Sequence, residues 1–157
     1  MITEYENTQS LIEDAPIWNN DCFKIMGKKW SGFGDYKNIN EVLVSFLSEV
    51  RKGDYVAINA FIPRNSRNEN LVAKLREKII LKTKTPTTLG FGPRFLHSTG
   101  QLHKGGANTG VFIEITQDPQ KDNNIPGETM TFGILERAQA LGDFKALQER
   151  GRRIIRI

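Results

Sequence analysis

The sequence predicts an α/β protein, a three-layer α/β/α sandwich built on a mostly parallel sheet. Stretches with a helical apolar stripe alternate with short apolar stretches rich in β-branched and aromatic residues. This order favours parallel strands joined by helices. The 157 residues, 38% hydrophobic and 25% charged, suit one globular domain with one core. No apolar run approaches the roughly 20 residues that cross a bilayer, so no membrane partner is expected.

The first part of the chain, residues 1–37, is expected to be an N-terminal tail or linker. It is polar, contains Pro16 and shows no sustained helical or strand periodicity. Residues 21–26 (DCFKIM) form a candidate short strand within it, followed by a glycine-rich loop. The folded domain is therefore predicted over residues 38–157.

The domain is predicted to begin with a helix and a strand. In residues 39–52 the apolar side chains recur at the spacing of one helical face. Asn40 is the expected N-cap and Gly53 the expected stop. Residues 54–62 (DYVAINAFI) then predict a strand, and their near-continuous apolarity indicates burial on both faces.

A second helix and strand lead into a long polar loop. Residues 66–82 predict the helix, because Ser66 and Glu69 have capping-box spacing ahead of an apolar stripe. Residues 85–89 are a candidate strand. The next segment, residues 90–106 (GFGPRFLHSTGQLHKGG), is predicted to be a loop because it is rich in glycine and polar residues.

The remaining elements complete the alternation. Residues 110–116 (GVFIEIT) predict a strand and residues 131–141 a helix. Gly142 is expected to interrupt this helix, and residues 144–150 form a second short one. Residues 152–157 (RRIIRI) are the expected last strand.

The loop over residues 90–106 is the predicted ligand site. Ligands of such folds bind beyond the carboxyl ends of the strands, and this loop directly follows a predicted strand. It offers positive charge and neutral hydrogen-bonding groups, which together suit a polyhydroxylated phosphate compound, while His97 can move protons near neutral pH. The candidate contacts to such a compound are Arg94, Ser98, Thr99, Gln101 and Lys104.

Plainer interpretations of these residues stay open. His97 follows two apolar residues and can instead be a packed core histidine, while His103 and Lys104 are expected to form a solvated rim. The two histidines are six residues apart, which fits neither a helical metal pair nor a closed zinc site. No metal is therefore expected. Nucleotide-binding glycine motifs are absent from the sequence.

Net charge and cysteine content limit which partners and which cellular compartment are expected. The net charge of +4 is spread along the chain. Nucleic-acid binding would favour a basic face with interleaved aromatic residues, so no nucleic-acid partner is expected. The N-terminus is polar and acidic, unlike a secretory signal. The single Cys22 excludes an internal disulfide framework, and a cytoplasmic protein is expected.

Several segments resemble a known family. FLHSTGQLHKGG, followed after a short turn by GVFIEIT, resembles the H-S-x-G-Q segment of bacterial-type glucose-6-phosphate isomerases. The likeness is closer to the C-terminal region of fused transaldolase/glucose-6-phosphate isomerase proteins, and it covers about residues 40–157 in order. The shared runs are residues 88–106, 125–127, 131–133, 139–143 and 151–153.

This resemblance implies a sugar-isomerase (SIS-like) fold, a parallel sheet sandwiched by helices. It also implies cofactor-free isomerisation of glucose 6-phosphate to fructose 6-phosphate, a step shared by glycolysis and gluconeogenesis. In that chemistry a histidine assists ring opening and a glutamate carries the proton between C1 and C2. The histidine's motif falls on His97, and Ser98, Thr99, Gly100 and Gln101 complete the segment.

The sequence also departs from the family. The glutamate segment, the C-terminal ring-opening segment and the glycine- and serine-rich phosphate segment have no counterpart. Glu114 and Glu128 are the nearest carboxylates, and each is expected to be structural or solvated. We therefore expect a part of a larger isomerase, weak or inactive alone, whose site is completed by the remaining half in cis or in trans or within a homo-oligomer. A non-catalytic sugar-phosphate-binding module or a structural module is the alternative.

Overall fold

The protein is built around one mixed sheet. The computed structural model describes residues 5 and 10–157 except 94, 96–97 and 120. In this part of the chain the sheet has six strands in the order β1-β2-β6-β5-β3-β4. Strands β6, β5, β3 and β4 run parallel, whereas β1 pairs antiparallel with β2 and β2 with β6. The strands are β1 (Trp18–Asn19), β2 (Lys24–Gly27), β3 (Tyr55–Phe61), β4 (Thr87–Phe91), β5 (Gly110–Thr116) and β6 (Arg153–Arg156).

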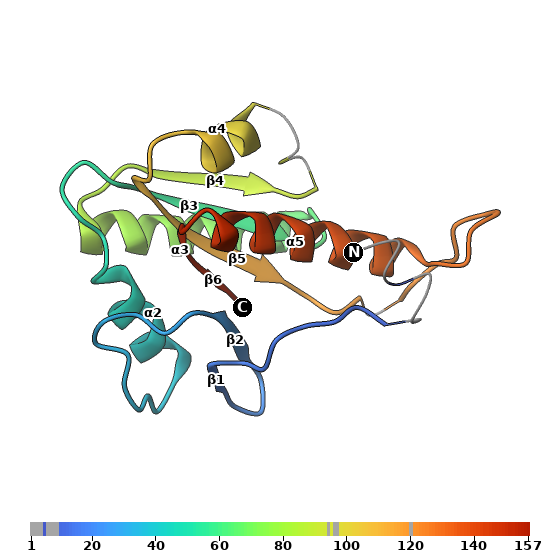
Figure 1. Ribbon diagram of the computed structural model, residues 1–157, viewed down its shortest axis with the longest axis horizontal. Helices are drawn as coiled ribbons and strands as arrows, with labels where there is room; N and C mark the ends of the chain where they lie inside the picture. Colours follow the sequence, from blue (N-terminus) through green and yellow to red (C-terminus); the bar gives the residue numbers. More distant parts are fainter. Residues whose placement is uncertain (1–4, 6–9, 94, 96–97, 120) are drawn as a thin grey trace.

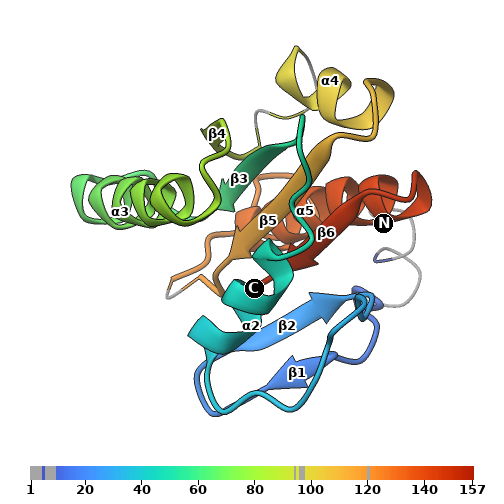
Figure 2. The ribbon, with the colours of Figure 1, turned by 90° about the vertical axis from the view of Figure 1, so that its left-hand side faces the viewer.

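Helices cover both faces of this sheet. In Figure 1 α5 lies in front of the strands and α3 behind them, and Figure 2 shows the two helices on opposite sides. Helices α2 and α3 pack on one face, and α5 on the other, with α4 beside it. The helices are α2 (Ile39–Leu47), α3 (Ser66–Thr83), α4 (Thr99–Gly105) and α5 (Phe132–Glu149).

The hydrophobic core has a cluster on each face of the sheet, because successive side chains of a strand point to opposite faces. On β3, Val56 and Ile58 join the cluster under α2 and α3, whereas Ala57 joins the cluster under α5. On β5, Phe112 packs on the α5 side. The prediction of an α/β fold with a mostly parallel sheet is confirmed for β3, β4, β5 and β6. The predicted burial of residues 54–62 on both faces is confirmed for β3.

The N-terminal part contributes more than the expected tail. The candidate strand is present as β2, and its Ile25 is fully buried in the same core as β5 and β6. Trp18, Trp30 and Tyr36 also pack against that core. This pairing covers the edge of β6, an edge that would otherwise present unpaired backbone groups. The sequence did not predict the antiparallel extension, because β1 and β2 are too short to show a period.

Two helices differ from their predicted form. Helix α5 continues through Gly142, so the predicted interruption there is wrong. A glycine costs a helix about 1 kcal/mol relative to alanine, and the burial of Leu141, Phe144 and Leu147 outweighs that cost. Residues 99–105, predicted as loop, form α4.

The helix caps shift by one or two residues. Asn38, rather than Asn40, caps α2, and its side chain accepts a hydrogen bond from the Glu41 amide. Asn65 rather than Ser66 caps α3 in the same way. In both cases an asparagine just ahead of the predicted cap fills the role, since its short amide side chain serves as well as serine there.

Candidate functional site

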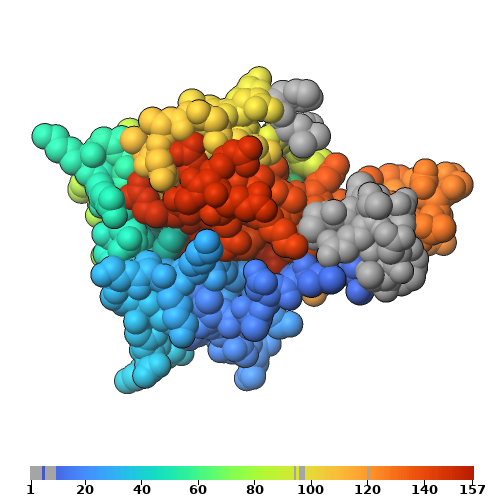
Figure 3. Space-filling view, viewed as in Figure 1, coloured from blue at the N-terminus to red at the C-terminus, as the bar shows by residue number. Residues whose placement is uncertain are grey.

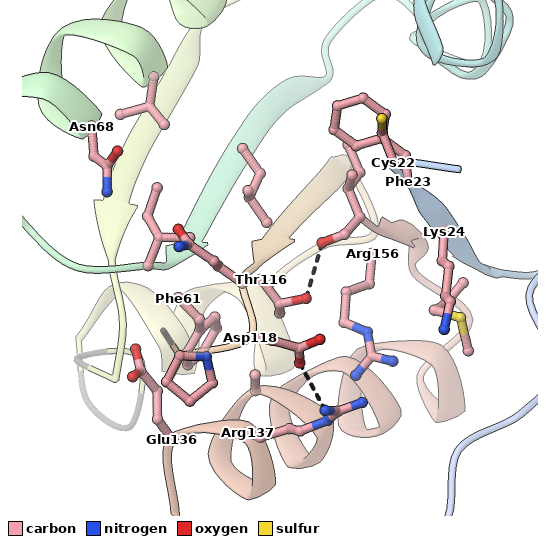
Figure 4. Close-up of a pocket in the computed structure, with 18 of the residues that line it drawn as sticks. Cys22, Phe23, Lys24, Phe61, Asn68, Thr116, Asp118, Glu136, Arg137 and Arg156 are labelled. Atoms are coloured by element: carbon pink, nitrogen blue, oxygen red, sulfur yellow. Dashed lines mark hydrogen bonds and ion pairs between the residues drawn. The ribbon is translucent and has the colours of Figure 1, made fainter. Parts of the chain in front are cut away.

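A cleft of about 690 Å³ opens at the carboxyl ends of β3, β5 and β6 (Figure 4). From β3 the chain passes to β4 on one side, then returns to β5 on the other side of β3. The direction of winding therefore reverses between β3 and β5, the point at which open α/β sheets bind ligands. The volume suits a small molecule. We call this the end cleft; its walls include Lys24, Phe61, Asn68, Leu71, Thr116, Asp118, Glu136, Arg137 and Arg156.

The walls of the end cleft differ in character. Leu71 and Val72 of α3, with Phe61 at the end of β3, give an apolar side. On the other side, Figure 4 shows Arg137 from α5 and Arg156 from β6 with their guanidinium groups toward one another. Such a cleft, mostly apolar with a few convergent polar groups, is the usual form of a small-molecule site.

The two arginines meet at one carboxylate. Arg137 donates from Nε to Glu13 Oε1 over 2.8 Å, and Arg156 donates to Glu13 Oε2. Arg137 also donates to Asp118 over 2.9 Å. Burial opposes ionisation of Glu13, but the charges and hydrogen bonds of Arg156 and Arg137 together hold its pKa below the usual value. Glu13 is therefore an ionised carboxylate bound by two guanidinium groups.

A polar row crosses the sheet beneath α5. Asn59, Glu114 and Arg156 lie side by side in register on β3, β5 and β6. Glu114 is fully buried, and neither of its carboxyl oxygens has a hydrogen-bond partner among the described residues. Burial raises the pKa of Glu114 well above its usual value, although the nearby Arg156 opposes this shift. Glu114 is thus enclosed rather than solvated.

The predicted ligand residues fall into three groups. Arg94 and His97 lie outside the described residues. Ser98, Thr99 and Gln101 are at the start of α4, where Thr99 and Gln101 are exposed. Lys104 is half-buried and forms an ion pair with Asp143 of α5, which is itself almost fully buried. The structure thus brings the three neutral residues together on one helical turn and engages the lysine elsewhere.

The loop that carries these residues packs against Phe61, which lines the end cleft. The rings of Phe95 and Phe61 lie 5.4 Å apart, and both cluster with Ala140 of α5. A Cβ added at Gly100 would lie 1.5 Å from the Phe95 carbonyl oxygen, and one at Gly92 would lie 2.4 Å from the Phe61 ring. These glycines therefore permit close packing of the loop between β4 and α4.

His103 is not a rim residue, contrary to the prediction. It is 3% exposed and lies among the rings of Tyr55, Phe95 and Phe112. The helical turn of α4 points Leu102 outward instead. Burial, with some help from Lys104 and Arg152, lowers the pKa of His103 to about 4. His103 is therefore neutral at pH 7 and belongs to the core.

Neither a metal site nor a membrane span is found in the described residues. Within that part of the chain, no group of three or more histidine, cysteine, aspartate or glutamate side chains is placed to hold a metal ion. None of the helices there is both long and apolar enough to span a membrane.

The arginine pair was not foreseen from the sequence. Glu13, Arg137 and Arg156 come from an N-terminal segment, a helix and the last strand, so nothing in their spacing connects them. The burial of Glu114, in contrast, could have been inferred from the sequence. It interrupts an apolar strand on the face that Phe112 buries, and strand alternation places both side chains on the same face.

Comparison with known proteins bears on the fold alone. No protein-family model and no curated protein matches the chain. A solved structure, that of a hypothetical protein from Thermus thermophilus, matches with a TM-score of 0.58 over 74% of this chain at 18% identity. The match covers 32% of that protein, so this chain spans about a third of its length. The architecture therefore recurs as part of a larger protein.

Proposed function

We propose that this chain is a glucose-6-phosphate isomerase-like domain, with a SIS-like fold, and that it works as part of a larger cytoplasmic isomerase. The proposed reaction interconverts glucose 6-phosphate and fructose 6-phosphate without a cofactor. The domain binds the sugar phosphate at the β4–α4 loop, and His97 assists ring opening. The remaining part of the site comes from another segment, in cis or in trans, or from a second copy of the chain.

One observation carries this proposal. The segment that resembles the isomerase motif follows the carboxyl end of β4 and continues into α4 beside the end cleft. Thr99 and Gln101 are exposed there, where their side chains can reach a ligand's hydroxyl and phosphate oxygens. A motif placed at this edge of a parallel sheet occupies the usual ligand position of the fold class.

The carboxylates explain why we propose weak or no turnover for the isolated chain. Aldose–ketose isomerisation needs a base that can reach the substrate. In the end cleft, Glu13 and Asp118 form ion pairs with arginines. Glu114 does not line the cleft and is fully buried beneath α5. Glu136 also lines the cleft, but the sequence around it does not match the family's glutamate segment. We assign the proton-transferring glutamate to the missing part of the site.

A coupled assay tests this function. Fructose 6-phosphate formation is followed in the isolated chain and in a longer protein that contains it. We expect the isolated chain to fall far below a typical enzyme rate of about 10 per second, and the longer protein to reach it. Turnover near that rate by the isolated chain would refute the claim of an incomplete site. No turnover by the longer protein would refute the isomerase proposal.

Sugar-phosphate binding without catalysis is the second candidate function. The ion pairs of Glu13 and Asp118 with arginines favour it, because the arginines can hold an anion and a carboxylate held in an ion pair serves poorly as a base. In this case the longer protein would bind glucose 6-phosphate and stay inactive. His97→Ala would then weaken binding while no isomerase activity appeared under any condition.

A further inference from the structure

The place where Arg137 and Arg156 meet has the geometry of an oxyanion site. Their guanidinium groups converge on the two oxygens of one carboxylate, Oε1 and Oε2 of Glu13. Guanidinium groups bind carboxylate and phosphate oxygens in the same forked arrangement. The Glu13 carboxylate therefore marks where two oxygens of a bound phosphate group would lie.

Arg156 needs an anion at this position. Its side chain is 5% exposed, and Glu13 is the carboxylate that pairs with it in the described part of the chain. The Phe144 ring lies 5.3 Å from its guanidinium and offers a weaker contact. If Glu13 leaves, a nearly buried cation remains without a partner, which is strongly unfavourable unless another anion replaces the carboxylate.

The surroundings also suit an incoming anion. Arg137 is half-exposed and opens the pair to solvent. Lys24 of β2 lines the end cleft near Arg156, as Figure 4 shows, and adds positive charge on the same side. The carboxyl group of Glu114, directly beside Arg156 in register, is fully buried, and burial raises its pKa and so disfavours its negatively charged form.

Glu13 can be displaced more easily than the arginines. It lies on the segment 10–16, which forms neither helix nor strand, whereas Arg137 and Arg156 are fixed on α5 and β6. Figure 3 shows the part of the chain that follows the N-terminal grey residues lying along the surface beside α5. A ligand that replaces the Glu13 carboxylate would therefore move a surface segment and leave the sheet intact.

We propose that Arg137 and Arg156 form a binding site for a phosphate group at the mouth of the end cleft, and that Glu13 occupies this site in the absence of ligand. The phosphate replaces the carboxylate oxygens of Glu13 and receives hydrogen bonds from both guanidinium groups. The site is distinct from the β4–α4 loop. It does not depend on the isomerase proposal, because inorganic phosphate is sufficient to probe it.

The test is a titration with inorganic phosphate at constant ionic strength, followed by thermal unfolding and by phosphorus NMR. Removal of the internal competitor in Glu13→Gln should lower the half-saturating phosphate concentration about tenfold or more relative to wild type. Glu69→Gln is the matched control. It breaks an exposed ion pair with Arg64, and neither residue lines the cleft, so it should bind phosphate like wild type.

Two further variants make the result decisive. Glu13→Asp keeps the charge but retracts it by one methylene group, so it should bind phosphate with an affinity between wild type and Glu13→Gln. Adding Arg137→Gln to Glu13→Gln should abolish the gain, and the half-exposed Arg137 can be replaced without opening the core. The proposal is overturned if Glu13→Gln and Glu69→Gln respond equally, or if the gain survives without Arg137.

Three ligands distinguish the source of the phosphate group. Glucose should leave Glu13→Gln unchanged. If Glu13→Gln gains affinity for glucose 6-phosphate over wild type as it does for inorganic phosphate, the site accepts phosphate monoesters; if the gain is confined to inorganic phosphate, it is a free-anion site. Absence of isomerase turnover in the longer protein, together with tenfold tighter phosphate binding in Glu13→Gln, would reject that function and leave the site standing.

Discussion

Glu114 and Arg156 lie opposite each other in register on β5 and β6, yet Arg156 donates its hydrogen bond to Glu13, 143 residues away in the sequence. The nearer carboxyl group has no hydrogen-bond partner among the described residues. Burial raises the pKa of Glu114 and disfavours its charged form, whereas the arginines lower the pKa of the more exposed Glu13, whose carboxylate pairs with Arg156. This choice of partner supports the anion site proposed at the cleft mouth.

Glu114→Gln should stabilise the protein at alkaline pH. The folded pKa of Glu114 is raised above its usual 4.5, so the folded state retains a proton that the unfolded state releases. Stability therefore falls as pH rises above about 4.5 towards the folded pKa. The glutamine variant should lack this fall and gain about 1–3 kcal/mol in free energy of unfolding at pH 8. Urea denaturation from pH 5 to 9 measures it.

The control for this prediction is Glu128→Gln, which alters an exposed loop carboxylate. It should leave the free energy of unfolding within about 0.5 kcal/mol of wild type across the same range. Equal pH profiles for wild type and Glu114→Gln would show that Glu114 is ionised and paired in solution.

His103 also makes stability depend on pH, but in the opposite direction. Its pKa is lowered from 6.5 to about 4 in the folded state, so the unfolded state binds a proton first as pH falls. Stability is full well above pH 6.5 and decreases by about 3 kcal/mol as pH falls from 6.5 to 4. His103→Phe, which fits an aromatic cluster, should lack this loss. Denaturation of both proteins at pH 4.5 and 7 measures the difference, and a parallel decrease in the variant would contradict it.

Gly100 should tolerate no side chain, whereas Gly105 should accept one. A Cβ at Gly100 would lie 1.5 Å from the Phe95 carbonyl oxygen, and nothing lies within 4 Å of one at Gly105. Gly100→Ala should therefore cost about 2 kcal/mol or more through backbone displacement, while Gly105→Ala should be neutral or slightly stabilising. Thermal unfolding of the two variants tests this, and equal melting temperatures would rule out the close packing.

The pair Asp54–Arg153 should be one of the costly ion pairs to break. Arg153 donates to both carboxylate oxygens of Asp54 over 2.7 and 2.9 Å, and Asp54 is buried. Asp54→Asn should cost about 3 kcal/mol of folding free energy, because it leaves Arg153 without a charged partner. Glu69→Gln, at an exposed pair, should cost less than about 1 kcal/mol. Similar losses for the two variants in urea denaturation would show that burial does not strengthen the Asp54 pair.

The sequence predicted the parts of the fold whose patterns are local. The long helices and the parallel strands show their periods within a few residues, and β5 was predicted at its observed bounds, Gly110–Thr116. Helix α4 was missed because its seven residues include two glycines, and its order depends on packing against α5 and Phe112. The continuation of α5 through Gly142 depends likewise on tertiary packing that overrides local preference.

Only the place of the candidate loop along the chain could be predicted. The loop follows the carboxyl end of β4, and Ser98, Thr99 and Gln101 lie at the start of α4. That these residues bind a ligand stays a prediction. The burial of His103, the engagement of Lys104 by Asp143 and the meeting of Glu13 with two arginines all depend on contacts between distant segments. No spacing in the sequence encodes such contacts.

The central claim, that the β4–α4 loop binds a sugar phosphate through His97, is tested most directly by calorimetric titration of glucose 6-phosphate. Wild type and Ser66→Ala, a control at the exposed start of α3, should bind with equal affinity. His97→Ala should bind at least about tenfold more weakly. Absence of saturable binding by wild type, or equal affinity in His97→Ala, would contradict the claim.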